Sequence, residues 1–201
     1  MRFAPIVPPQ GLRVLERVGV GYHFVLGQEL LRGGMYFKYY RALGRLGHFI
    51  IVDNGAAEYN TPEFAAVVEA AKRIHASEIV LPDVLADSIR TREALTPLVK
   101  ELVPPRMRMI VPQGKNVGEW MGCLEDQLFL TGGEIASIGI PKHMEDRTPG
   151  GRATILEELK HMWPGVLSRV SIHLLGVQLD PFREMAAAAA TNVIVRGIDS
   201  G

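Results

Sequence analysis

The stretch Phe49-Ile50-Ile51-Val52-Asp53-Asn54-Gly55 contains the feature that decides the fold class. Its four consecutive apolar residues would make a strand that is hydrophobic on both faces, which a sheet tolerates only when both of its sides are covered. A polar turn of Asp, Asn and Gly follows at once and marks the end of the strand. Met109-Ile110-Val111 repeats the apolar pattern. Both stretches are typical of buried parallel strands in α/β proteins.

Similar short runs of apolar and β-branched residues recur along the whole chain. They cover Arg2–Val7, Tyr22–Leu26, Phe49–Val52, Glu78–Leu81, Met107–Val111, Ala136–Ile140, Ser171–Gly176 and Val193–Ile198. Helical stretches lie between most of them, with starts at Thr61-Pro62-Glu63, at Asn116 followed three residues later by Glu119, and at Asp180-Pro181. This alternation predicts an α/β fold, a compact (β/α)8 TIM barrel. The chain stops at Gly201, directly after the eighth run, so we expect the last helix to be missing or to lie beyond the chain end.

The composition is that of a globular protein, with 47% hydrophobic and 22% charged residues in 201 residues, and it predicts one domain over residues 1–201. The formal net charge is zero, so a nucleic-acid partner would have to be met by basic groups gathered locally. Cys123 is the only cysteine, which excludes an intrachain disulfide and fits a reducing, cytoplasmic compartment. Neither a signal peptide nor a membrane-spanning apolar run is found, so we expect a soluble protein.

Polar residues follow most of the predicted strands. Asp53-Asn54-Gly55 ends the third, Pro82-Asp83 the fourth, Pro112-Gln113-Gly114 the fifth, Gly139-Ile140-Pro141-Lys142 the sixth, Gly176-Val177-Gln178 the seventh and Asp199 the eighth. Taken singly, each Asp or Asn has an ordinary explanation as a turn former or helix cap. In a TIM barrel, however, all the βα loops open at one face. Three carboxylates and an amide meeting there would repel and desolvate one another unless a ligand used them, which predicts a shared site.

Other kinds of site find little support. The six histidines, among them His23, His143 and His173, show no paired metal-ligand spacing, so we expect no metal. The glycine pairs form neither a P-loop nor a GxGxxG motif after a strand, so we expect no nucleotide cofactor. Trp120 and Trp163 lie in helical stretches, where core packing is the more common role.

The ordered strand ends resemble the tRNA-guanine transglycosylases from the third strand to the last. Asp53-Asn54-Gly55 is similar to the family's Asp-Ser-Gly, Val111-Pro112-Gln113-Gly114 to Val-Gln-Gly, Ser137-Ile138-Gly139-Ile140-Pro141 to Ala-Ile-Gly-Gly-Leu, Leu175-Gly176-Val177-Gln178 to Met-Gly-Val-Gly, and Arg196-Gly197-Ile198-Asp199 to the start of Gly-Ile-Asp-Met-Phe-Asp. Asp83 falls where the family places an Asp that reads the guanine edge. No single motif is specific to the family. The resemblance rests on all of them occurring in the same order as in the family.

The resemblance implies base exchange at guanine through a covalent aspartyl intermediate, with Asp199 as nucleophile and Asp53 as general acid/base or as the group that orients the departing base. In the family, the nucleophile is the second Asp of Gly-Ile-Asp-Met-Phe-Asp, so the role has either moved to Asp199 or lies past Gly201. The expected base-binding residues are Asn54, Asp83, Gln113, Gly139, Ile140, Gly176 and Gln178. Lys142, Arg147 and Arg152 are expected to contact phosphates, although a solvated loop explains their pattern equally well.

The family's cysteine and histidine zinc site has no counterpart in this chain. A short, zinc-free form resembles the phage-encoded relatives that insert 7-deazaguanines into DNA, which share the Gly197–Ser200 ending. We therefore expect DNA and a deazaguanine base such as 7-cyano-7-deazaguanine as partners, in the host cytoplasm if the chain is phage-encoded. A tRNA substrate, an inactive binding barrel and an unrelated barrel lyase or isomerase stay open as alternatives, and so does a homodimer.

Overall fold

A computed structural model describes residues 1–55, 63–95, 101–176 and 180–200 of the chain. Its strands are β1 (Arg2–Ala4), β2 (Tyr22–Leu26), β3 (Phe49–Asp53), β4 (Glu78–Val80), β5 (Arg108–Ile110), β6 (Ser137–Pro141), β7 (Ser171–Leu175) and β8 (Val195–Asp199). The described helices are η1 (Pro9–Gly11), α1 (Leu12–Val18), α2 (Gly27–Arg32), α3 (Gly34–Arg45), α4 (Phe64–Arg73), α5 (Ser88–Ala94), η2 (Pro105–Met107), α7 (Val117–Thr131), α8 (His143–Arg147), α9 (Gly151–Met162), α10 (Pro164–Leu167) and α11 (Pro181–Ala190).

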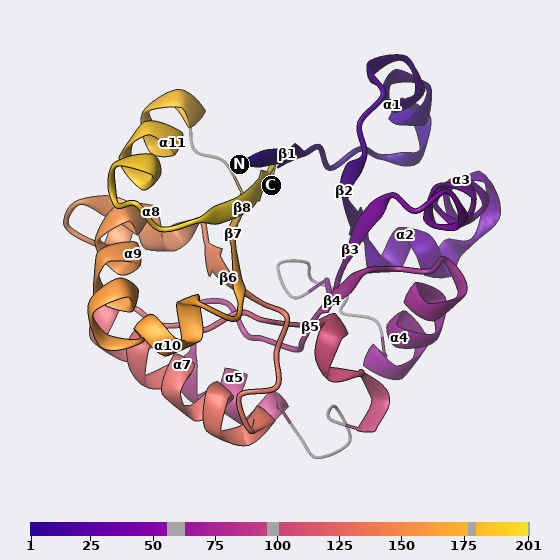
Figure 1. Cartoon of the computed structure of the whole chain (residues 1–201). Helices are drawn as coiled ribbons and strands as arrows, with labels where there is room; N and C mark the ends of the chain where they lie inside the picture. Colours follow the sequence, from indigo (N-terminus) through magenta and orange to yellow (C-terminus); the bar gives the residue numbers. More distant parts are fainter. Residues whose placement is uncertain (56–62, 96–100, 177–179, 201) are drawn as a thin grey trace.

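The eight strands form one parallel sheet in the order β1-β8-β7-β6-β5-β4-β3-β2, with the helices arranged around it (Figure 1). Strands β1 and β8 pair at one end of this order and β2 and β3 at the other, so the sheet curls into a nearly closed barrel. Within the described residues, the seam between β1 and β2 has no ladder of hydrogen bonds. The compact (β/α)8 barrel predicted from the sequence is confirmed.

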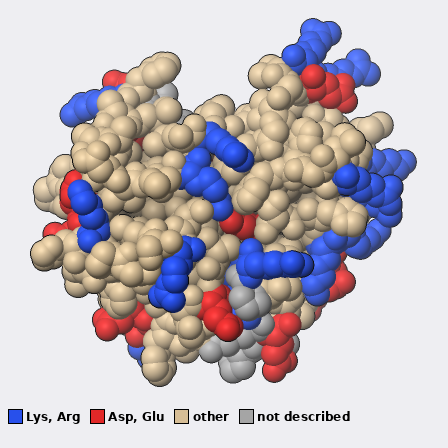
Figure 2. Space-filling view, viewed as in Figure 1, with Lys and Arg blue, Asp and Glu red and all other residues tan. Residues whose placement is uncertain are grey.

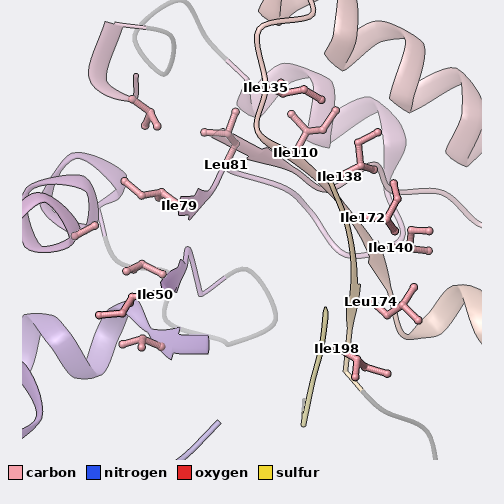
Figure 3. Close-up of a cluster of buried hydrophobic side chains, with 14 of the residues drawn as sticks. Ile50, Ile79, Leu81, Ile110, Ile135, Ile138, Ile140, Ile172, Leu174 and Ile198 are labelled. Carbon is pink, nitrogen blue, oxygen red and sulfur yellow. The ribbon is translucent and has the colours of Figure 1, made fainter. Parts of the chain in front are cut away.

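Strand side chains alternate between two apolar layers. In β3, Ile50 and Val52 face the outer layer between sheet and helices, whereas Ile51 belongs to a smaller cluster inside the barrel. Figure 3 shows the outer layer, to which each strand from β3 to β8 contributes a buried isoleucine. Burying such a side chain stabilises the fold by about 1.5–3 kcal/mol. The apolar pattern on both faces therefore reflects two cores, one on each side of the sheet.

Two predicted strand boundaries shift by more than one residue in the structure. Strand β1 ends at Ala4 because Pro5 has no N–H for a ladder hydrogen bond. Strand β8 begins at Val195, since Asn192 has a φ of 59° and Ile194 is 87% exposed, so this segment is still a turn. Two of the helix starts are confirmed by caps, in which Asn116 Oδ1 accepts from Glu119 N at 2.9 Å and Asp180 Oδ1 from Arg183 N at 3.0 Å. Thr61 and Pro62 lie outside the described residues.

Candidate functional site

A cavity of about 430 Å³ opens at the carboxyl ends of the strands, and we call it the mouth cavity. Its lining residues are Ile6, Phe24, Asp53, Val80, Asp83, Leu85, Val111, Gln113, Pro141, Lys142, His143, Asp146, Leu175, Gly176 and Asp199. Asp53, Asp83, Gln113 and Asp199 share this cavity although the chain separates them widely, so their predicted convergence is confirmed. Apolar walls with a few convergent polar groups are typical of small-molecule sites, whose volumes run from about 300 to 1,000 Å³.

Asp83 sits at the centre of a hydrogen-bonded trio in this wall. Its Oδ1 accepts from Asn54 Nδ2 at 2.7 Å, and its Oδ2 accepts from Gln113 Nε2 at 2.5 Å. Burial raises the pKa of the Asp83 carboxyl to about 6, and the two amide hydrogen bonds offset part of this rise. Each carboxylate oxygen keeps a second lone pair for a ligand donor. The carboxylate is therefore held in place before any ligand arrives.

Gln113 and Asn54 were expected to bind the base, but both direct an amide donor at Asp83. Gln113 Oε1 already accepts from Ala86 N at 2.9 Å, so this amide faces Asp83 with its donor side. Asn54 is buried outside the cavity lining and also donates to the Leu81 carbonyl at 2.6 Å. Both side chains therefore orient Asp83, and Asp83 is the acceptor that the trio presents to the cavity.

Asp199 ends β8 and lines the mouth cavity. In the sheet order, β7 and β6 separate β8 from β5, β4 and β3, the strands that precede the three residues of the trio. Asp199 Oδ1 accepts from the backbone N–H of Gly176 at 3.0 Å, and Asp199 Oδ2 lies 3.2 Å from His173 Nε2. Gly176 has a φ of 71°, in the left-handed region that favours glycine, and this turn points its N–H at the carboxylate. Asp53, the other expected catalytic residue, is half-buried at the end of β3 and lines the same cavity.

The remaining expected base contacts are placed differently. Gly139 and Ile140 do not line the cavity: Ile140 is buried in the outer core, and its carbonyl accepts from Arg152 Nη1 at 2.9 Å. A Cβ at Gly139 would lie 2.8 Å from Leu175 Cδ1 and 3.0 Å from Val111 Cγ2, so glycine lets these two wall residues approach. Gln178 lies outside the described residues.

The three expected phosphate contacts separate into two groups. Lys142 and Arg147 are exposed, and Lys142 lines the mouth cavity. The expectation for Arg152 is wrong, because its side chain is 1% exposed and forms a buried ion pair with Glu184 of α11. The same guanidinium donates to the carbonyls of Leu175 and Gly176 at 2.8 and 2.7 Å. Arg152 thus connects the carboxyl ends of β6 and β7, and its guanidinium is too deeply buried to contact a phosphate.

Sequence reasoning missed two histidines at the site. His143 lines the cavity and lies 3.2 Å from the Gly114 carbonyl through Nε2, and burial lowers its pKa. His173 lies inside the barrel and stacks on Phe24 of β2, with ring centroids 5.6 Å apart. The signal that could have found it was strand alternation: Ile172 and Leu174 face outward, so His173 is a polar residue at an inward position.

Basic side chains also gather away from the mouth. Figure 2 shows Lys and Arg clustered over the flank formed by α3 and α4. Helix α3 carries Lys38, Arg41 and Arg45 at exposed positions and contains no Asp or Glu. These three residues share one helix face because they are spaced three and four apart. Helix α3 therefore presents a positively charged face although the chain as a whole has no net charge.

Two absences concern the described part of the chain only. No group of three or more His, Cys, Asp or Glu side chains there could hold a metal ion. No described helix combines the length and the apolar character needed to cross a membrane.

No protein-family model matches the chain, and no curated protein matches its sequence significantly. Among solved structures, an N-acetylneuraminate lyase from Mycoplasma synoviae matches with a TM-score of 0.64 and 11% identity over 99% of this chain and 68% of the lyase. The aldolase QR15 matches with a TM-score of 0.64 and 12% identity, over 100% of this chain and 89% of its own. A wild-type sialic acid aldolase from Ruminococcus gnavus gives 0.59 and 10%, over 99% and 67%. At these identities the likeness shows that the chain shares the barrel fold of these structures, and nothing more.

Proposed function

We propose that the chain is a guanine transglycosylase that exchanges guanine in DNA for a 7-deazaguanine such as 7-cyano-7-deazaguanine. The observation that carries the proposal is the arrangement of Asp53, Asp83 and Asp199 around one cavity of about 430 Å³. One carboxylate is held by amide groups in a manner suited to reading a base. Two others, at the ends of β3 and β8, supply the pair of carboxylates that glycosidic bond chemistry commonly uses.

Guanine recognition follows from the donors of the base. Its N1–H and 2-amino group lie side by side on one edge, and a carboxylate can accept both through its two oxygens. Asp83 offers such a carboxylate, oriented by Asn54 and Gln113. Adenine has no N1 proton and no 2-amino group, so it would leave the buried acceptor without a partner. The apolar walls from Phe24, Val111 and Leu175 suit the faces of a planar base.

The exchange needs a group that holds the sugar while one base leaves and another enters. In the proposed step, an Asp199 oxygen forms a bond to C1′ as the C1′–N9 bond breaks. The electron pair of that bond goes to the departing guanine, which takes a proton from Asp53. The incoming base returns its proton to Asp53 and displaces Asp199 from C1′. The Asp199 carboxylate is held in place for this attack by the backbone N–H of Gly176 at 3.0 Å and by His173 Nε2 at 3.2 Å.

The preference for DNA over tRNA rests on the resemblance to the zinc-free, phage-encoded relatives, whereas the expected phosphate contacts and the α3 cations would supply positive charge for either nucleic acid. The target nucleotide must leave the base stack before the mouth cavity can reach its glycosidic bond. Lys142 lines the cavity and Arg147 follows it in α8, whereas Lys38, Arg41 and Arg45 form a separate basic face on α3. A tRNA substrate and an inactive barrel that binds deazaguanine are the alternatives.

The test is incorporation of labelled guanine or 7-cyano-7-deazaguanine into DNA and, in parallel, into tRNA. Asp199→Asn is nearly isosteric and should abolish exchange and the covalent protein–DNA adduct on denaturing gels. Asp53→Asn should slow exchange by about 10²–10⁴-fold without complete loss, because it removes proton transfer only. Full exchange by Asp199→Asn would move the nucleophile elsewhere. No exchange by the wild-type chain on either nucleic acid, with base binding retained, would favour the inactive barrel.

A further inference from the structure

A continuous chain of hydrogen bonds crosses the interior of the barrel and ends on Asp199. Arg196 Nε donates to Tyr22 Oη at 3.1 Å, Tyr22 Oη lies 2.9 Å from His173 Nδ1, and His173 Nε2 lies 3.2 Å from Asp199 Oδ2. At its far end, the Arg196 guanidinium forms a two-pronged ion pair with Glu78, at 2.5 and 2.6 Å. The chain therefore links the amino ends of β2, β4 and β8 to the site at the mouth.

The direction of each hydrogen bond in the chain follows from the groups at its two ends, Arg196 and Asp199. An arginine can only donate, so Tyr22 Oη accepts from Arg196, and its own proton is left to donate to a bare His173 Nδ1. An ionised carboxylate can only accept, so His173 Nε2 carries the ring proton and donates it to Asp199. Burial raises the pKa of Tyr22, which keeps the proton on its hydroxyl. The neutral tautomer of His173 with the proton on Nε2 is the one form that satisfies the whole chain.

The surroundings hold these groups in place. His173 is completely buried, and its ring stacks on Phe24. The Tyr22 ring packs against the backbone of Gly197, where a Cβ would lie only 2.6 Å from its Cε1 atom. Ser137 Oγ donates to Glu78 at 2.7 Å, so the acid at the start of the chain has a further partner. Each member is fixed by packing or by a second hydrogen bond.

We infer that His173, held by Tyr22, is a positioning residue that fixes the rotamer of Asp199 and keeps its carboxylate ready for attack on C1′. This inference rests on the proposed function for the identity of the reaction. His173 touches Asp199 and does not line the mouth cavity, so it acts through the carboxylate and not on the base. In metal sites, losing a hydrogen bond that orients a ligand side chain lowers activity by about 10- to 100-fold, and we expect a loss of similar size here.

Two substitutions at His173 separate positioning from packing. His173→Gln keeps a donor that can reach Asp199 and an acceptor for Tyr22, whereas His173→Leu removes both. We expect His173→Leu to lower kcat for base exchange by about 10- to 100-fold with little change in the affinity for guanine, which Asp83 reads. His173→Gln should recover most of that loss. Thermal unfolding of both variants shows whether the barrel is intact.

The ring tautomer gives a readout that needs no activity. Nitrogen-15 NMR of the histidine-labelled chain should show His173 with a protonated Nε2 and a bare Nδ1 near neutral pH. Tyr22→Phe, which deletes the donor to Nδ1, should allow the other tautomer to appear. A proton on Nδ1 in the wild-type chain would overturn the inference, as would equal kcat for folded His173→Leu and wild type. If the expected tautomer is seen and the wild-type chain exchanges no base, the proposed function fails while the hydrogen-bond chain holding Asp199 stands.

Discussion

Arg152 and Glu184 form a buried ion pair, with side chains only 1% and 5% exposed. Glu184 belongs to α11, whereas Arg152 lies in the first turn of α9 and donates to the carbonyls of Ile140, Leu175 and Gly176 at the ends of β6 and β7. The pair therefore ties two helices to two strand ends. Gly176 also donates to Asp199, so Arg152 supports the turn that orients the proposed nucleophile.

Arg152→Met should destabilise the fold by about 3–5 kcal/mol, because it leaves the Glu184 carboxylate buried without its cation. Urea unfolding followed by circular dichroism measures the change. The matched control is Arg92→Met, which breaks an exposed pair with Asp126 and should cost about 0–1 kcal/mol. Unchanged stability of Arg152→Met together with weaker DNA binding would return Arg152 to the role of a phosphate contact.

The affinity for guanine should fall as the pH is lowered through about 6. Burial raises the pKa of Asp83 to about 6, so the carboxylate that accepts the base's donors becomes protonated below this pH. Each further pH unit should then weaken binding by up to about tenfold. Calorimetric titrations between about pH 5 and pH 8 would measure the affinity for guanine below and above this pKa. Asp83→Asn should bind weakly at every pH, and a pH-independent wild type would argue against Asp83 as the reader of the base.

Gly139→Val should raise the KM for the incoming base without unfolding the barrel. The added side chain would collide with Leu175 and Val111, whose atoms lie 2.8 and 3.0 Å from the position of a Cβ, and both residues line the mouth cavity. Overpacking of this kind typically costs about 1–3 kcal/mol. Gly122→Ala is the control, since nothing lies within 4 Å of its Cβ position. Equal KM values for the two variants would show that Gly139 does not shape the cavity.

Binding to DNA should weaken with salt, and the slope should depend on named cations. Removing one cation that neutralises a phosphate lowers the slope of log K against log salt by about 0.9 for duplex DNA. We expect Lys38→Gln, Arg41→Gln and Arg45→Gln together to reduce the slope measured by fluorescence anisotropy. Arg90→Gln with Arg92→Gln on α5 removes charge from a different helix and should leave it unchanged. Equal slopes for both sets would exclude α3 from the DNA interface, and Lys142→Gln with Arg147→Gln tests the mouth in the same assay.

The placement of the strands could be predicted from the sequence because it depends on local pattern. A strand such as Ile50-Ile51-Val52 is apolar at successive positions, and only a sheet covered on both faces buries all of them. Polar residues directly after such strands must meet at one end of a parallel barrel, whatever their distance along the chain. Asp53, Asp83 and Asp199 reached the same cavity for this reason.

What each polar side chain does was decided only by the tertiary structure. Gln113 turned its donors toward Asp83 because the N–H of Ala86 occupies its oxygen, and Arg152 was buried because Glu184 arrives from a distant helix. Such partners lie far apart in the sequence, and no local pattern encodes which of them will meet. The amino-acid sequence by itself therefore determined the barrel and brought Asp53, Asp83, Gln113 and Asp199 to its mouth. Long-range hydrogen bonds determined the roles of the polar side chains, because a polar group buried in a low-dielectric site is costly unless it has a hydrogen-bond partner.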